Sequence, residues 1–192
     1  MHMKRRLLCI TIFCYGCGSG QSDQKEIAET VTATQIRPGV ANLSGLQIIE
    51  EKDGNGKVTS VGFYLNGKKE GSWTTYFSGG GAIRTLTTYI QDKKEGWYLE
   101  FGENNSLTKR IMYHEDQRHG EYKEFVYAAV REHRNYQNGK QDGVTKVFYD
   151  TGKLMEEGLY KNGVREGISK WYDQEGNVTI EYEYKDGQLV KK

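Results

Sequence analysis

The chain of 192 residues contains 24 glycines, 14 tyrosines and one proline, where average usage would give about 13 glycines. Lysine and arginine number 27 against 26 aspartates and glutamates, which excludes a strongly basic nucleic-acid-binding protein. A mean hydropathy of −0.78 and three cysteines exclude a multi-span membrane protein and a disulfide scaffold. The 12 % of aromatic residues indicates a folded chain.

The first 16 residues have the pattern of a signal peptide, with three consecutive basic residues followed by an apolar stretch of ten. That stretch is too short for a membrane-spanning helix, which needs about 20 residues. Gly16, Cys17 and the small residues that follow resemble the cleavage and acylation site of bacterial lipoproteins, with Cys17 as the lipidated residue. Because Cys14 stands where that site normally has an aliphatic residue, an ordinary signal peptide or an uncleaved anchor stays open.

Residues 17–44 are predicted to hold the lipidated Cys17 and a flexible polar tether to the membrane. All three cysteines lie at or before residue 17, so no disulfide or thiol nucleophile is available beyond it. Cleavage before Cys17 leaves 24 basic and 26 acidic residues, a net charge of −2. Gly18, in place of aspartate, resembles the outer-membrane sorting signal, so we expect an outer-membrane lipoprotein of the cell envelope, periplasmic or surface-exposed.

Residues 45–192 are built from a repeat of ~24 residues, present about five and a half times. A glycine opens each Gly-x-x-x-x-aromatic unit, at Gly71, Gly96, Gly120, Gly143 and Gly167. A tyrosine follows an aliphatic residue at a distance of six, at Tyr64, Tyr89, Tyr113, Tyr136, Tyr160 and Tyr184. Each tyrosine precedes a predicted turn, at Asn66-Gly67, Asp92-Lys93, Asp116-Gln117, Asn138-Gly139, Asn162-Gly163 and Asp186-Gly187.

These spacings predict strands. An even spacing of six places the aliphatic residue and the tyrosine on one face of a strand, and Asn-Gly or Asp-Gly suits a type I′ hairpin. A second strand is expected from each repeat glycine to its aromatic residue. The fold predicted is all-β: an elongated single-layer antiparallel β-meander of about eleven strands, built of ~24-residue β-hairpin repeats. Tyrosine suits such a half-wetted face, because its ring is buried while its hydroxyl meets water.

The run Tyr-x-Asn-Gly-Lys-x-x-Gly-x-x-x-x-Phe-Tyr-x-x-Gly-x-Leu at 136–154 resembles the MORN repeat variant, which occurs in bacterial proteins called YwqK-type antitoxin components. The resemblance covers residues 54–190, with a degenerate third unit in which the turn at 126–129 lacks its glycine. It implies an elongated, twisted single sheet that serves in scaffolding, partner binding or membrane association.

No catalytic constellation is found, and neither an enzyme nor a cofactor is predicted. His114 and His119 do not have the spacing of a metal site and are interpreted as solvated turn residues. Glu156 and Glu157 are consecutive, so in a strand they point to opposite faces and make a poor acid–base pair.

The position two residues after each repeat glycine changes along the chain. It holds Trp73, Tyr98 and Tyr122 in the first three units, then Thr145 and Ser169. On simple alternation it has the opposite parity to the aromatic residue five after the glycine. The three aromatic residues are interpreted either as local packing or as an exposed patch that binds a partner, a glycan or another copy.

The function predicted is that of a non-catalytic binding or scaffold module, held at the membrane by a lipid on Cys17 and recognising a protein or envelope polymer but no nucleic acid. The alternative is an intracellular antitoxin-like protein that neutralises a toxin by direct binding. The predicted signal peptide discriminates between the two functions, because only the first requires export.

Overall fold

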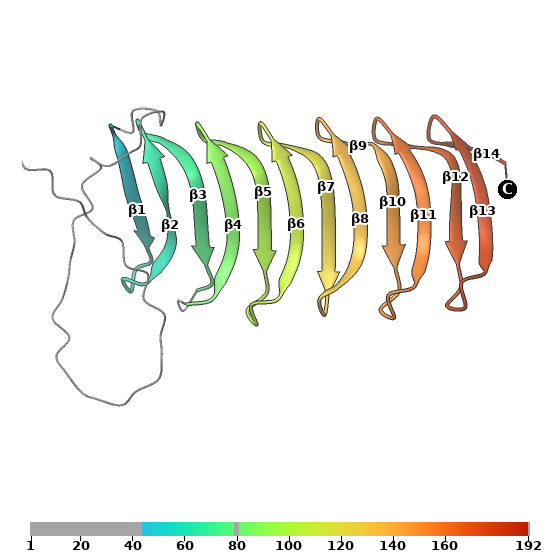
Figure 1. Ribbon diagram of the computed structural model, residues 1–192, viewed down its shortest axis with the longest axis horizontal. Coiled ribbons are helices and arrows are strands. Elements are labelled where there is room, and N and C mark those ends of the chain that lie inside the picture. Colours follow the sequence, from blue (N-terminus) through green and yellow to red (C-terminus); the bar gives the residue numbers. More distant parts are fainter. Residues whose placement is uncertain (1–43, 79–80, 192) are drawn as a thin grey trace, which may run out of the picture. The chain divides into compact units, whose positions relative to one another are not determined.

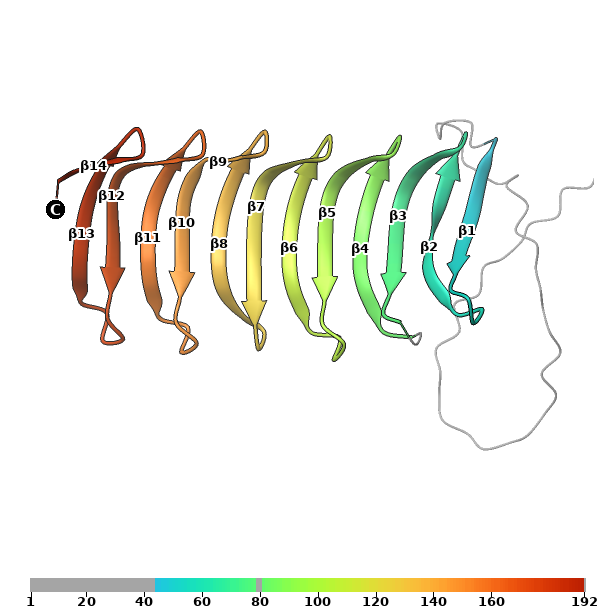
Figure 2. The same cartoon turned by 180° about the vertical axis from the view of Figure 1, so that it is seen from behind.

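The computed structural model describes residues 44–78 and 81–191, which form one antiparallel sheet of 14 strands with no helix (Figure 1). The strands pair in chain order, except that the short β9 pairs only with β8. Figure 2 shows the same single layer from behind. The predicted all-β, single-layer antiparallel meander is therefore confirmed. The predicted signal peptide, Cys17 and tether lie outside the described residues, apart from Ser44.

Two kinds of strand alternate along the sheet. The first kind contains the repeat tyrosine: β2 (Val58–Leu65), β4 (Ile83–Ile90), β6 (Leu107–His114), β8 (Ala129–Gln137), β11 (Leu154–Lys161) and β13 (Val178–Lys185). The second kind contains the repeat glycine: β3 (Lys68–Tyr76), β5 (Lys93–Phe101), β7 (Gln117–Val126), β10 (Gly143–Phe148) and β12 (Val164–Tyr172). The expectation of about eleven strands missed β1 (Leu46–Lys52), β9 (Lys140–Gln141) and β14 (Gln188–Lys191).

The repeat glycines lie inside their strands in four of the five units, not at the start as predicted. All five have positive φ, from 68° to 108°, a conformation that glycine adopts without strain. Around Gly96, Thr87 pairs with Tyr98 and Tyr89 pairs with Lys94, so that Thr88 faces the three residues 95–97. The glycine therefore sits in a β-bulge, which simple period-2 alternation does not reveal.

The hairpin turns that follow the tyrosine-containing strands have two central residues, both with positive φ, as type I′ turns require. The predicted Asn-Gly and Asp-Gly turns are confirmed. In two units the prediction was one residue too late, because the central pairs are Gln91-Asp92 and Glu115-Asp116. The degenerate third unit also turns tightly, with positive φ at Tyr127 and Ala128.

One face of the sheet carries the repeat tyrosines, and we call it the tyrosine face. The buried side chains form a central row on this face: Ser60, Trp73, Thr87, Ile111, Tyr122, Thr145 and Ser169. The pairs Trp73↔Thr87 and Ile111↔Tyr122 show that the row crosses strands in register. Longer side chains on either side of the row cover it, so a single layer still has a narrow core.

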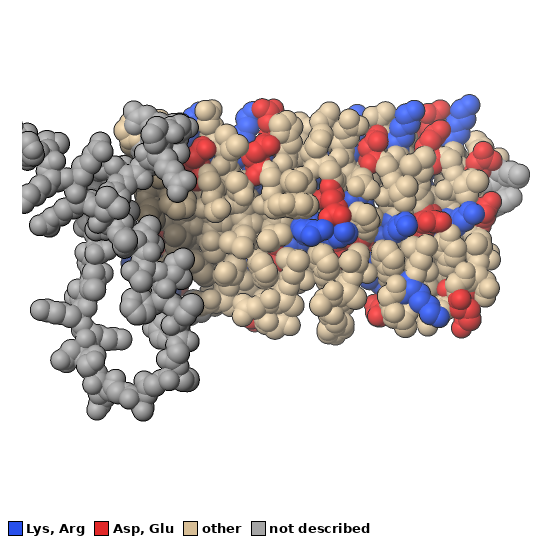
Figure 3. Space-filling view, in the orientation of Figure 1, with Lys and Arg blue, Asp and Glu red and all other residues tan. Residues whose placement is uncertain are grey.

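The opposite face is charged over the later strands. Figure 3 shows basic and acidic side chains alternating across the strands from β6 onward, with few charges at the centre of β2–β5. Ion pairs on this face join Lys123 to Glu121 at 2.6 Å and Lys170 to Glu181 at 3.3 Å. Among residues 44–78 and 81–191 there is no helix of the length and apolarity that a membrane span needs.

Candidate functional site

An open groove of about 770 Å³ lies on the tyrosine face over β1–β5, within the size range of small-ligand sites. Its aromatic lining consists of Trp73, Tyr76, Phe77, Tyr89, Tyr98 and Phe101. Its charged lining consists of Lys69, Arg84, Lys94, Glu51 and Glu100. The structure thus brings together two of the three predicted binding residues, Trp73 and Tyr98, and leaves Tyr122 outside the groove.

Trp73 forms the floor of the groove. The side chain is only 2 % exposed, and its indole Nε1 donates to the carbonyl oxygen of Phe63 at 3.1 Å. The ring rests on the backbone of Gly62, where an added Cβ would lie 2.2 Å from ring carbons. Lys69 Nζ lies 4.1 Å from the ring centroid. Of the two interpretations, local packing therefore fits Trp73 and an exposed patch does not, since its neighbours cover the indole.

Tyr98 is half-buried, whereas Tyr122 is 7 % exposed and belongs to the core, so local packing is also the interpretation that fits Tyr122. Each hydroxyl donates to a carboxylate two residues later, Tyr98 to Glu100 and Tyr122 to Glu124, both at 3.0 Å. Burial, together with these carboxylates, raises the pKa of both phenols above the ordinary value. Both hydroxyls consequently remain protonated donors.

Tyr76 and Phe101 enter the same groove, although alternation predicted that they would have the opposite parity. The register shifts between Thr75 and Tyr76, and again between Glu100 and Phe101. The extra residue lies in the partner strand, Arg84 of β4 and Thr108 of β6, and such a bulge bends the local backbone and re-aims the side chains beside it. The two aromatic series predicted to be separate therefore meet over β3 and β5.

A cation position two residues before the repeat glycine was missed by the sequence reasoning. It holds Lys69, Lys94, Arg118, Gln141 and Arg165. Lys94 Nζ lies 5.5 Å from the Tyr98 ring centroid and 5.0 Å from that of Tyr113, within the range of a cation–π contact. A basic residue at this position in four of five units is the signal that could have revealed it.

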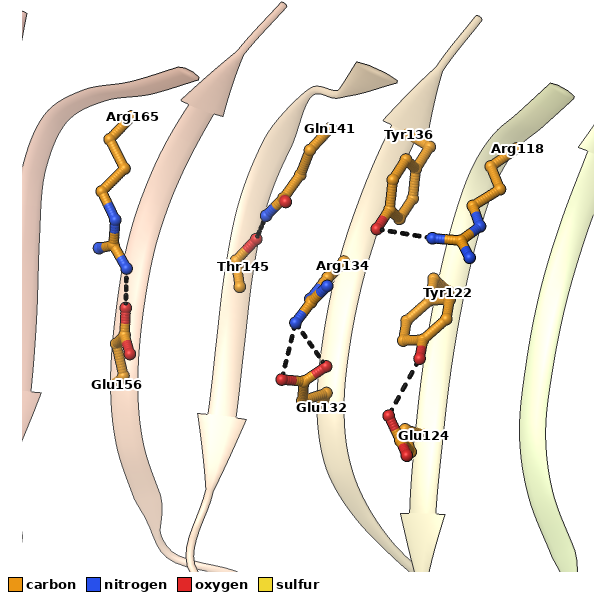
Figure 4. A network of polar contacts seen from close by, with 10 residues as sticks. All are labelled: Arg118, Tyr122, Glu124, Glu132, Arg134, Tyr136, Gln141, Thr145, Glu156 and Arg165. Carbon is orange, nitrogen blue, oxygen red and sulfur yellow. Dashed lines mark hydrogen bonds and ion pairs between the residues drawn. The ribbon is translucent and has the colours of Figure 1, made fainter. Parts of the chain in front are cut away.

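In the later units the residue at this position forms hydrogen bonds or an ion pair with neighbouring side chains (Figure 4). Arg118 donates to the hydroxyl of Tyr136 at 3.3 Å, and Gln141 donates to the hydroxyl of Thr145. Arg165 pairs with Glu156 at 2.5 Å and donates to Ser169 at 3.2 Å. Each of these side chains thus has a polar partner nearby, and those of Arg118 and Arg165 link adjacent strands.

The repeat tyrosines are all half-buried. Five of them lie directly opposite a repeat glycine, in the pairs Gly71↔Tyr89, Gly96↔Tyr113, Gly120↔Tyr136, Gly143↔Tyr160 and Gly167↔Tyr184. Tyr64 has Gln47 and Lys69 as its partners instead. The predicted repeat positions therefore meet one another across neighbouring strands.

The histidines near the third hairpin turn make local contacts. His114 Nδ1 lies 2.9 Å from a carboxylate oxygen of Glu95, and the rings of His114 and His119 meet edge to face at 5.7 Å. The hydrogen bond to Glu95 raises the pKa of His114. Within the described residues, no three His, Cys, Asp or Glu side chains are grouped so that they could hold a metal ion.

Comparison with known proteins gives one family. No curated protein matches the chain. The MORN repeat variant matches residues 141–162, which span β10 and β11, and residues 165–186, which span β12 and β13. The chain thus contains two adjacent MORN-variant repeats, and the units before them have the same alternation of strands and the same glycine–tyrosine pairing.

Proposed function

We propose that this protein is an exported, lipid-anchored and non-catalytic binding module of the bacterial cell envelope. In this proposal Cys17 carries the lipid, the residues up to 44 act as a tether, and the groove over β1–β5 binds the partner. The observation that carries the binding role is the groove itself, an aromatic and charged hollow of about 770 Å³. MORN-variant repeats at 141–162 and 165–186 support a binding role.

Export and acylation are tested by metabolic labelling of the full chain with a fatty-acid analogue. We expect label in the wild type and in Cys14→Ala, and its loss in Cys17→Ala. Retention of label in Cys17→Ala would contradict acylation at that residue. An unlabelled wild type retained in the cytoplasm would favour the antitoxin-like alternative.

Binding through the groove is tested with a matched pair of variants at neighbouring positions. Tyr98→Ser alters the groove lining, whereas Trp97→Ser alters a side chain 40 % exposed on the opposite face. We expect only Tyr98→Ser to reduce capture of an envelope component by the full chain, with thermal unfolding confirming that both variants are folded. Equal capture by the two folded variants would place the binding surface elsewhere.

A further inference from the structure

The first two units differ from the later ones in what surrounds the cation before the repeat glycine. Lys69 and Lys94 lie over aromatic rings, and within the described part of the chain neither ammonium group has an ion pair or a hydrogen bond. Arg118 and Arg165 at the equivalent positions are bonded to neighbouring side chains. The two lysines with available donors are the two that line the groove.

The acidic side chains of the groove are already engaged. Glu51 accepts a hydrogen bond from the hydroxyl of Ser60 at 2.6 Å. Glu100 accepts from the hydroxyl of Tyr98 at 3.0 Å and pairs with Lys109 at 3.1 Å. Lys69, Lys94 and the exposed Arg84 therefore present positive charge, and within the described residues none of the three forms an ion pair with Glu51 or Glu100. An ammonium group with free N–H donors is suited to a carboxylate or another anion.

The rest of the lining is suited to a sugar ring. Half-buried aromatic side chains, among them Phe77 and Tyr89, offer ring surface to the C–H face of a sugar. Threonine hydroxyls such as those of Thr75 and Thr85 can accept further hydrogen bonds from sugar hydroxyl groups.

The position of the groove also argues against a peptide. Of the strands under the groove only β1 lies at the edge of the sheet, whereas β2–β5 are each paired on both sides and leave few main-chain groups for the N–H and C=O groups of an extended peptide. A carbohydrate can be bound by side chains alone.

We propose that the groove binds an acidic carbohydrate, a sugar chain that carries carboxylate groups, with Lys69 and Lys94 each binding one carboxylate. Because β4 separates β3 from β5, the two lysines are about 10 Å apart along the sheet, which suits acidic groups on alternate sugars. This inference rests on the proposed function, since it names the ligand class of the same groove.

The test compares polygalacturonate with its methyl ester, which has the same sugar chain without the charges. Binding to the purified full chain is measured by isothermal titration calorimetry. We expect polygalacturonate to bind and the ester to bind at least about tenfold more weakly, because charge-assisted hydrogen bonds are lost. The double variant Lys69→Met/Lys94→Met should show a similar loss, while Lys69→Arg/Lys94→Arg should keep the binding.

The matched control is Lys68→Met/Lys93→Met. It also removes two positive charges, but from exposed lysines that each lie one residue before Lys69 or Lys94 and do not line the groove. We expect the affinity of this control variant for polygalacturonate to stay within about twofold of that of the wild type. Thermal unfolding of each variant confirms that a loss of binding is not a loss of fold.

Several results would overturn the inference: no binding of polygalacturonate to the folded wild type, equal binding of the ester, equal binding of polyglutamate, or an equal loss in the control variant. If Tyr98→Ser still abolishes capture of an envelope component in that event, the acidic carbohydrate is ruled out as the ligand, while the proposal that the groove binds a partner is retained. If Tyr98→Ser has no effect on capture either, the groove fails as the binding site.

Discussion

Gly96 lies directly opposite Tyr113 across the β5–β6 pair, and a glycine faces a tyrosine in the same way in five units. The backbone at Gly96 has a φ of 82°. No heavy atom lies within 4 Å of a Cβ built there. The positive φ of the bulge, and not a lack of space, therefore accounts for glycine at this position.

Gly96→Ala should destabilise the sheet by about 1–2 kcal/mol, the usual cost of a left-handed backbone for an L-residue. The measurement is the free energy of unfolding from urea denaturation. Gly54→Ala is the control, because Gly54 also has open space around its Cβ but lacks a positive φ. Equal losses in the two variants would show that the bulge conformation is not what selects glycine.

Gly62→Ala should displace the indole of Trp73, because the new Cβ would lie 2.2 Å from ring carbons. Overpacking of this kind costs about 1–3 kcal/mol. The chain has three tryptophans, so Trp97→Phe/Trp171→Phe leaves Trp73 as the only indole fluorophore. In that background we expect Gly62→Ala to shift the emission to the red as Trp73 meets water. Unchanged emission would contradict the close packing of Trp73 on Gly62.

Ala128→Gly should stabilise the protein by about 1 kcal/mol, because the third unit turns through two non-glycine residues. Tyr127 and Ala128 have φ of 50° and 65°. Ala129→Gly, one residue later in β8, is the control and should give no gain, since Ala129 does not have positive φ. A lower melting temperature for Ala128→Gly than for the wild type would contradict the turn geometry.

The repeat, the strand order and the half-buried tyrosines could be predicted from the sequence because they follow from periodic residue types. Bulges could not be predicted, since the extra residue Arg84 in β4, opposite the step from Thr75 to Tyr76, leaves the repeat spacing unchanged while it shifts the register. The choice between packing and exposure for Trp73 could not be made from the sequence for a related reason. It depends on Gly62 and Lys69, which meet the ring only once the strands pair in register.

The groove itself was only partly foreseen. Trp73 and Tyr98 were singled out as aromatic residues, but Lys69 and Lys94 were not, because a lysine in a polar repeat looks like any solvated charge. Within the described residues their ammonium groups have no ion pair or hydrogen bond, while the guanidinium groups of Arg118 and Arg165 do. That contrast depends on three-dimensional neighbours, which the spacing of residues does not report.

Two histidines should titrate on opposite sides of the ordinary value of about 6.5. The hydrogen bond to Glu95 raises the pKa of His114. Burial, with Lys123 nearby, lowers the pKa of His133, although Glu121 Oε1 lies 3.4 Å from its Nε2. Imidazole NMR shifts followed from about pH 5 to pH 8 check both directions. Titration of the two residues at the same pH would contradict this arrangement.

The pH dependence of the stability follows from the direction of each pKa shift. For His133 the unfolded chain binds a proton more readily than the folded chain, so its titration makes the protein less stable as the pH falls below about 6.5. His114 acts in the opposite sense: its contribution to the stability is complete below about pH 6.5 and is lost as the pH rises through its folded-state pKa.

His133→Gln should therefore lose less unfolding free energy than the wild type between about pH 7.5 and pH 5.5. His114→Gln should lose more over the same interval, because it lacks the group that gains stability at low pH. An identical pH dependence in both variants would show that neither histidine is coupled to folding.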